Sequence, residues 1–234
     1  MAISGNTPFN KVTGGNLVLM RHGQTAWALN SQYTGRSNIP LTEIGKDQAA
    51  KAKPFLKGYN FWDNLDSQVW VSPLKRAQQT AQIAIGNTYK TVDNLQEWDY
   101  GKLEGHFVPD INQLLGHTFN IWQEGVDIDV SSLPPVPQFF DQDGNEVKPA
   151  QLPGEKISDV AKRAQQVIDE VSPLLAEGKD ILLVAHAHIL RVLTCVYLGL
   201  DPAHGQNLVL DTASVSVLGV NSGNPALFKW NQVL

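Results

Sequence analysis

The sequence contains only one cysteine, Cys195, in 234 residues, which excludes an intrachain disulfide and a four-cysteine zinc site. Basic residues are also few, because 18 Lys and Arg stand against 23 Asp and Glu. No run of Lys or Arg is long enough to follow a nucleic-acid backbone, and the formal net charge is −5. These features argue against nucleic acid or an anionic membrane surface as a partner.

Long hydrophobic runs are absent as well. The most apolar stretch, Ile181–Leu200, contains His186, His188 and Arg191, so we do not interpret it as a membrane span. Residues 1–15 lack the apolar core of a signal peptide and are polar, which predicts a flexible lead-in. The simplest expectation is a cytoplasmic protein with no membrane partner.

The pattern that is present indicates an α/β protein with a packed core, since 42% of residues are hydrophobic. Apolar runs alternate with amphipathic stretches, which favours a parallel sheet covered by helices. The predicted strands are 16–20, 68–71, 88–92 and 180–185, and the predicted helices are 41–56, 72–85, 154–175 and 188–198. Residues 214–220 and 226–230 alternate around an Asn-Ser-Gly-Asn turn. We therefore predict a three-layer α/β/α sandwich with a mostly parallel central sheet and a C-terminal antiparallel hairpin, formed as a single domain over residues 16–234.

Two helix starts carry capping signals. Thr42 is the expected N-cap of the first long helix, and Ser72, with Pro73 at the first helical position, is the expected N-cap of the second.

Residues 105–152 break the alternation of strands and helices. Five prolines lie between Pro134 and Pro153, and the segment has seven acidic residues against one basic residue, Lys148. A long irregular segment inside a compact domain is usually functional, so we predict a lid or binding insertion here.

Reactive side chains follow four of the predicted strands. The segments are Arg21-His22-Gly23-Gln24-Thr25, Ser72 to Thr80 with Arg76, Glu97-Trp-Asp-Tyr-Gly101, and Ala185-His186-Ala187-His188. The carboxyl ends of parallel strands meet at one edge of a sheet, so these groups are expected to converge there. Two histidines and two arginines at one edge form a positive site that suits a phosphoryl group.

The residue types fit phosphoryl transfer. A neutral imidazole is a good nucleophile toward phosphorus, and fixed arginines can hold the charge on the transferred group. The departing alkoxide needs a proton, which a carboxylic acid such as Glu97 can supply.

In these four segments the chain resembles the histidine phosphatase (phosphoglycerate-mutase-like) superfamily, over about residues 16 to 230. The resemblance implies that His22 accepts the phosphoryl group, that Arg21, Arg76 and His186 form the phosphate pocket, and that Glu97 donates the proton. No metal or cofactor is implied. The expected partner is a small phosphorylated substrate, and a homo-oligomer is compatible with the sequence.

The chain is most similar to sedoheptulose-bisphosphatase-like members, through Gln32-Tyr-Thr-Gly35, Glu97-Trp-Asp-Tyr-Gly101, Asn120-Ile-Trp122 and the His-x-His segment. The further residues predicted at the phosphate or substrate are Gly23, Gln24, Tyr33, Thr34, Gly35, Trp122, Ala187 and His188. Two residues depart from the family pattern. Ala28 stands where mutases have a phosphate-holding Asn, and Ala187 replaces the usual Gly.

The favoured function is a phosphomonoesterase that acts through a phosphohistidine on a small metabolite, such as a sugar phosphate. The main alternative is a cofactor-dependent phosphoglycerate mutase. We disfavour it because an acidic insertion facing the cleft would hold a polyanion poorly. A non-catalytic binding protein is disfavoured because His22 and Glu97 are both present.

Two other hypotheses about the site have less support from the sequence. Asp127-Ile-Asp129 matches the paired aspartates of haloacid-dehalogenase-type phosphatases, but no apolar strand precedes it. His186 and His188 stand two apart at a strand end and point in different directions, which argues against a metal site.

Overall fold

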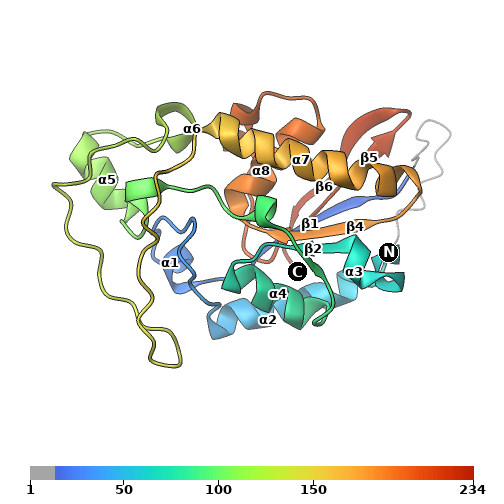
Figure 1. Ribbon diagram of the computed structural model, residues 1–234, viewed down its shortest axis with the longest axis horizontal. Helices are drawn as coiled ribbons and strands as arrows, with labels where there is room; N and C mark the ends of the chain where they lie inside the picture. The colour runs from blue at the N-terminus through green and yellow to red at the C-terminus, as the bar shows by residue number, and fades with distance from the viewer. Residues whose placement is uncertain (1–13) are drawn as a thin grey trace.

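The computed structural model describes residues 14–234, so most of the predicted lead-in of residues 1–15 lies outside the described residues. The described residues form a six-stranded sheet with the strand order β3-β2-β4-β1-β5-β6 (Figure 1). The strands are β1 Leu17–Arg21, β2 Val69–Val71, β3 Lys90–Thr91, β4 Ile181–Ala185, β5 Val215–Asn221 and β6 Asn224–Gln232. The first four are mutually parallel, whereas β5 and β6 run antiparallel to their neighbours.

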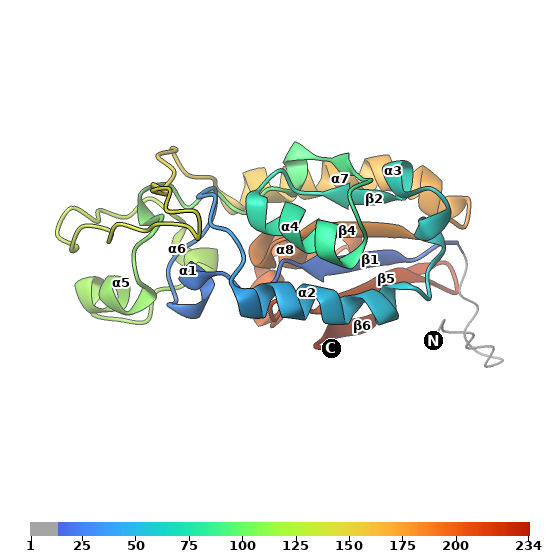
Figure 2. The same cartoon turned by 90° about the horizontal axis from the view of Figure 1, so that it is seen from below.

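Helices cover both faces of the sheet, which confirms the predicted sandwich (Figures 1 and 2). The α-helices are α1 Ala26–Leu29, α2 Glu43–Leu56, α3 Leu65–Gln68, α4 Lys75–Ala84, α5 Val108–Leu115, α6 Ile121–Glu124, α7 Ile157–Ala176 and α8 Ala187–Tyr197. The 3-10 helices are η1 Asn60–Asp63, η2 Asp93–Leu95, η3 Gly101–Leu103 and η4 Pro202–Asn207. Helices α2 and α4 pack on one face, and α7 and α8 pack on the other.

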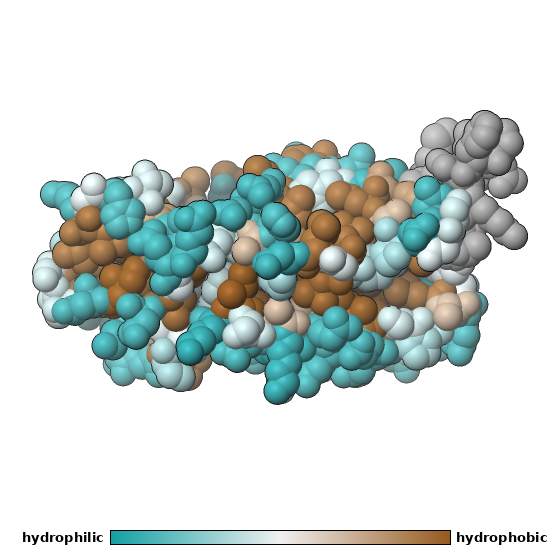
Figure 3. Space-filling view, turned by 90° about the horizontal axis from the view of Figure 1, so that it is seen from above, coloured by the Kyte–Doolittle hydropathy of each residue, from teal (hydrophilic) through white to brown (hydrophobic). Residues whose placement is uncertain are grey.

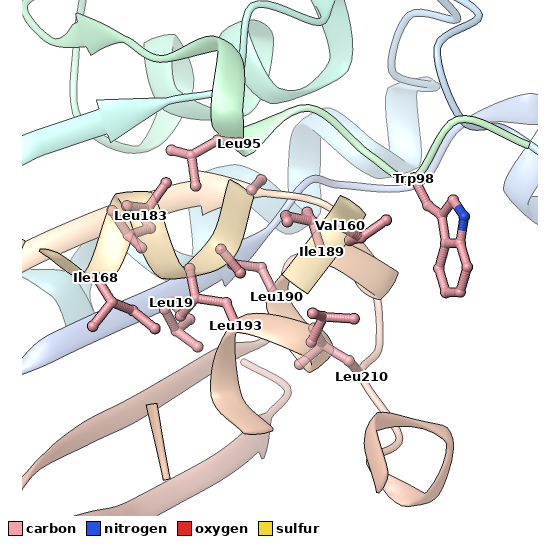
Figure 4. Close-up of a cluster of buried hydrophobic side chains, with 14 of the residues drawn as sticks. Leu19, Leu95, Trp98, Val160, Ile168, Leu183, Ile189, Leu190, Leu193 and Leu210 are labelled. Carbon is pink, nitrogen blue, oxygen red and sulfur yellow. The ribbon is translucent and has the colours of Figure 1, made fainter. Parts of the chain in front are cut away.

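The central strands are apolar throughout because both of their faces are buried. Successive side chains of a strand point to opposite faces, so β1 sends Leu17 and Leu19 into one core cluster and Val18 and Met20 into the other. Figure 4 shows the first cluster, where side chains of α7 and α8 meet Leu19 and Leu183. This double burial fixes the position of the loops that leave β1 and β4.

The predicted start of α4 is wrong. The helix begins at Lys75, after Leu74, and Leu74 makes no side-chain cap. Ser72, the expected N-cap, accepts from the N–H of Leu74 at 3.3 Å, ahead of the first helical residue, and also lies with its hydroxyl 2.7 Å from His186 Nε2. By contrast, Thr42 caps α2 as predicted, with its Oγ1 accepting from the N–H of Gly45.

The insertion contains more regular structure than predicted, because α5 and α6 lie within it. It extends beyond the end of the sheet at which β1 and β4 finish (Figure 2). Its distal loop returns to the main body, where Lys75 Nζ pairs with Asp141 at 3.3 Å and Gln142 donates to Glu43 at 3.0 Å. The insertion is thus fastened to the starts of α4 and α2.

The outer surface mixes residue types. On the face seen in Figure 3, hydrophobic side chains gather in two areas, one over the insertion and one nearer the middle, with hydrophilic side chains between them. Across residues 14–234, no helix is both long enough and apolar enough to cross a bilayer.

Candidate active site

The predicted site residues converge at the carboxyl edge of β1 and β4. Arg21 pairs with Ala185 across the two strands, and the N–H of His22 donates to the carbonyl of Ala185 at 2.9 Å. This register puts His22 beside His186, with their ring centroids 5.1 Å apart. The two histidines therefore meet because the strands that carry them are neighbours in the sheet.

The His22 ring is held in one tautomer. Its Nδ1 lies 2.7 Å from the carbonyl oxygen of Gly23, which can only accept, so Nδ1 carries the proton and Nε2 keeps its lone pair. Burial, followed by the cations of Arg76 and Arg21, holds the pKa of His22 well below its usual value. The ring is therefore neutral at physiological pH, as a nucleophile must be.

Gly23 supports His22 through close backbone packing. A Cβ at this position would lie 2.2 Å from the carbonyl oxygen of Gly45, so only glycine fits here without moving the backbone. The N–H of Gly23 also donates to Thr80 Oγ1 at 3.0 Å, which ties the turn after β1 to α4.

We expect the rings of His22 and His186 to stay neutral as the pH falls from 8 to below 6. Burial and the Arg76 cation hold the pKa of both well below its usual value, so protonation begins only at lower pH. Nitrogen-15 NMR of histidine-labelled protein tests this. His117, whose pKa is raised by its hydrogen bond to Glu124, is the internal control and should titrate above 6.5. Protonation of His22 at or above the pH of His117 would contradict the neutral-nucleophile assignment.

Arg21 supplies a donor that the protein leaves unused. Its Nη1 donates to the carbonyl of Leu210 at 2.6 Å, which anchors the side chain beside His22. Its Nε is buried and has no hydrogen-bond partner among the described residues. Because an orphaned buried donor is costly, this nitrogen is a natural partner for an anionic oxygen.

Arg76 and His186 form a buried pair beneath the cavity. Arg76 is fully buried and donates through Nε to His186 Nδ1 at 3.0 Å. Its Nη1 and Nη2 donate to carbonyls of the loop after α1, at Ser37, Thr34 and Gly35. Since Nδ1 of His186 accepts, its Nε2 carries the proton that faces Ser72. In this arrangement the predicted phosphate ligands Arg76 and His186 are held by protein groups.

Glu97 is buried at the start of α8. Its Oε1 accepts from the N–H groups of Trp98 and Ile189, and its Oε2 accepts from the N–H of His188, all at 2.9–3.0 Å. Burial by itself raises the pKa of Glu97, but its hydrogen bonds to His188 hold that pKa well below its usual value. The raised pKa expected of a proton donor is therefore not found in the unliganded site. A carboxylate at a helix N-terminus is stabilised as the anion.

His188 and Tyr100 form a second pair at the cavity wall. The Tyr100 hydroxyl lies 2.6 Å from His188 Nδ1, and the two rings meet edge to face at 5.6 Å. His188 and His186 point to different partners, as the sequence predicted for residues two apart.

A cavity of about 300 Å³ opens above these groups. The predicted site residues that line it are Arg21, His22, Tyr33, Thr34, Glu97, Ala187 and His188. Ala28 lines it too, so a methyl group faces the space where mutases have an Asn.

Three further predicted residues act from behind the cavity wall. Gly23 and Gly35 shape the backbone, and a Cβ on Gly35 would lie 2.3 Å from the carbonyl oxygen of Trp98. Gln24 accepts from the Thr42 hydroxyl at 2.9 Å and so connects the turn after β1 to the start of α2.

Trp122, a predicted cleft residue, does not line the cavity beside His22. Trp122 packs behind His188, with ring centroids 5.2 Å apart, and it stacks under the Arg191 guanidinium at 4.7 Å. It lines a separate hollow beside Ile157 instead. Tyr100, which belongs to the predicted reactive segment Glu97–Gly101, lines the cavity.

Ser72, Thr80 and Leu210 contribute to the site without having been predicted to do so. Ser72 contacts His186, Thr80 accepts from Gly23, and the Leu210 carbonyl holds Arg21. The first two lie in a segment that the sequence marked as reactive. A backbone carbonyl such as that of Leu210 leaves no residue-type signal.

The described residues contain no group of three or more His, Cys, Asp or Glu side chains arranged to hold a metal ion. Cys195 is a buried free thiol.

Comparison with known proteins identifies the family. The chain matches the Histidine phosphatase superfamily (branch 1) over residues 17–131 and 124–233. It is 28% identical to an acid phosphatase of Mycobacterium tuberculosis over 207 residues, which cover 88% of this chain and 87% of that protein. It is 30% identical to a 2,3-bisphosphoglycerate-dependent phosphoglycerate mutase of Bifidobacterium longum, over 76% of this chain and 74% of the mutase. It is 27% identical to sedoheptulose 1,7-bisphosphatase of Saccharomyces cerevisiae, over 78% and 67%.

Two solved structures have folds similar to that of this chain. A mycobacterial glucosyl-3-phosphoglycerate phosphatase has a TM-score of 0.70 and 26% identity, with 93% of this chain and 98% of that chain covered. The product of a Mycobacterium tuberculosis open reading frame has a TM-score of 0.74 and 26% identity, with 94% and 98% covered. The chain therefore belongs to the histidine phosphatase superfamily, and it is an enzyme of that superfamily.

Proposed function

We propose that this enzyme is a phosphomonoesterase that transfers the phosphoryl group of a small metabolite, such as a sugar phosphate, to His22 and then to water. One observation carries the proposal: a neutral His22 with its Nε2 free lies in a cavity beside the buried, unpartnered Nε of Arg21. In the first step the Nε2 lone pair forms the N–P bond while the P–O bond to the leaving alkoxide breaks. Water then attacks the phosphohistidine and releases phosphate.

The proton for the leaving alkoxide is assigned to Glu97. A bound phosphate would bring negative charge close to this carboxylate, which raises its pKa from the low value of the unliganded site. The other acids of the segment are less suitable. Asp99 accepts from the N–H groups of Gly101 and Gly154, and Glu104 accepts from the Ser37 hydroxyl, so neither faces the cavity.

A phosphoglycerate mutase is the second candidate, because the Bifidobacterium longum mutase is 30% identical. The acidic insertion no longer argues against it, since none of its seven acids lines the cavity. Ala28 still disfavours a mutase, because its methyl group cannot hold the phosphate that a mutase must retain.

We expect hydrolysis to exceed mutase activity by at least about tenfold, because nothing at Ala28 retains the phosphoryl group. The two activities are measured on one preparation: phosphate release from a sugar phosphate, and interconversion of 3- and 2-phosphoglycerate with the bisphosphate primer. Interconversion faster than hydrolysis would identify a mutase.

Chelator is present throughout these assays, and hydrolysis should be unaffected by it, since the predicted site uses arginine and histidine. Activity lost in chelator and restored by one metal would contradict the metal-free mechanism.

Glu97→Gln should slow hydrolysis of alkyl phosphates at least about tenfold more than hydrolysis of nitrophenyl phosphate. The reason is that an alkoxide needs a proton to leave, whereas nitrophenolate does not. Glu104→Gln is the matched control, because it alters a buried carboxylate of the same segment outside the cavity. The control should affect both substrates equally. Equal losses in Glu97→Gln, with unchanged thermal unfolding, would transfer the role to the His188–Tyr100 pair.

A further inference from the structure

The part of the cavity beyond the phosphate position is poor in positive charge. Among the described residues that line it, Arg21 is the only Arg or Lys. Arg21 ends β1 directly before His22 and lines the cavity with it, so Arg21 is assigned to the transferred phosphoryl group and is not available to a second anion. The same lining includes Glu97, an anion in the unliganded site.

Other arginines around the cavity are committed to protein partners. Arg191 donates to the carbonyls of Gly205 and Gln206 at 2.8 and 2.9 Å. Arg36 pairs with Glu155 at 3.2 Å and does not line the cavity, although its buried Nε has no partner among the described residues. Arg76 is fully buried beneath the cavity. Recruiting Arg191 or Arg76 to a second anionic group would break their contacts and leave carbonyls unpaired.

Neutral residues make up most of the remaining lining. They include Ser31, Gln32, Tyr33 and Thr34, with Tyr100 and the apolar Val108. The Thr34 hydroxyl donates to the Gln32 carbonyl, so its oxygen can still accept from a hydroxyl of a polyol, and aromatic rings can pack against the C–H faces of a polyol. The volume of about 300 Å³ is at the small end for ligand sites.

We propose that this cavity selects small phosphate monoesters whose remaining part is uncharged and rich in hydroxyl groups, and disfavours esters with a second phosphate or a carboxylate. This specificity rests on the proposed phosphatase function. It separates this enzyme from relatives whose names specify bisphosphorylated substrates, because a second phosphate would meet neutral polar groups where it needs cations.

Matched substrate pairs test the proposal. Glycerol 3-phosphate and 3-phosphoglycerate differ by a hydroxymethyl against a carboxylate, and fructose 6-phosphate and fructose 1,6-bisphosphate differ by one phosphate. In each pair we expect kcat/KM to favour the ester whose remaining part is uncharged by at least about tenfold, because a second anion would lose its water to a lining that offers no cation besides Arg21. High salt should reduce the ratio only weakly, since the charges are buried.

A charge placed in the wall should move this specificity. Ala28→Lys adds a cation to the lining and is expected to shift the ratio at least about tenfold toward the charged member. Leu29→Lys is the matched control, because Leu29 is 64% exposed on the same helix α1 and does not line the cavity. The control should leave the ratio unchanged. A folded Ala28→Lys protein, verified by thermal unfolding, with an unaltered ratio would contradict the proposal.

These assays distinguish failure of the proposed phosphatase function from failure of the inferred substrate specificity. If neither member of a pair nor nitrophenyl phosphate is hydrolysed, the phosphatase function and the specificity both fail. If both members are hydrolysed and the charged one is equal or preferred, the phosphatase function stands and the inferred specificity is wrong.

Discussion

His22→Asn should lower kcat by at least about a hundredfold, which corresponds to roughly 3 kcal/mol of activation free energy. Asn can still donate a side-chain N–H toward the Gly23 carbonyl, so the local fold is retained, but it lacks the free ring nitrogen that attacks phosphorus. The wild-type enzyme, quenched during turnover with labelled substrate, should carry an acid-labile phosphate on the peptide from Val18 to Asn30. The variant should carry none.

His117→Asn is the control for this experiment. His117 is exposed, pairs with Glu124 and lies outside the cavity, so its replacement should leave kcat within about twofold, as is usual for surface substitutions. A His22→Asn enzyme with more than about a hundredth of the wild-type kcat would show that another group is the nucleophile.

Arg76→Met should have the second-largest effect, lowering kcat/KM by about 10²-fold, because Arg76 holds His186 and the loop after α1 in place and a small misplacement of such groups is that costly. The buried cation of Arg76 also lowers the pKa of His22 and His186. Without it, the pKa of each histidine should rise, so that the acid limb of kcat/KM moves to higher pH. Activity at pH 6 should therefore fall further than activity at pH 8.

Stability should fall in the same variant. Arg76 donates to the carbonyls of Thr34, Gly35 and Ser37, and buried carbonyls without donors cost about 1–3 kcal/mol each. Denaturant unfolding measures this loss. Lys75→Met is the control: Lys75 is the preceding residue of α4, with its side chain 40% exposed. It should retain activity within a few-fold. An Arg76→Met enzyme with a wild-type pH profile would mean that Arg76 is only structural.

Much of the site could be predicted because it follows from strand order and residue type. The apolar run before Arg21 and His22 predicted β1, and the rule that parallel strands share one carboxyl edge predicted that His186 would lie nearby. Both placements agree with the structure.

What could not be predicted depends on contacts that sequence patterns do not encode. Ser before Pro is the same signal whether the hydroxyl caps a helix or contacts a histidine, so the role of Ser72 was misassigned. Trp122 and Tyr100 are both aromatic residues near motif segments. Only the packing of α6 shows that Tyr100 lines the cavity, whereas Trp122 lies behind His188. The negative charge of the insertion follows from its composition. Whether the acidic side chains face the cavity or the solvent does not, because charged side chains of a loop turn to solvent unless partners hold them.

The position of β1 between β4 and β5 has a consequence for synthesis of the protein. His22 leaves the ribosome well before its neighbours in the sheet, which span residues 181–221. At roughly 5–20 residues per second, β1 waits on the order of ten seconds or more for these partners. During that time an apolar segment is without its sheet, so the nascent chain is expected to need protection from aggregation until residues 181–221 emerge.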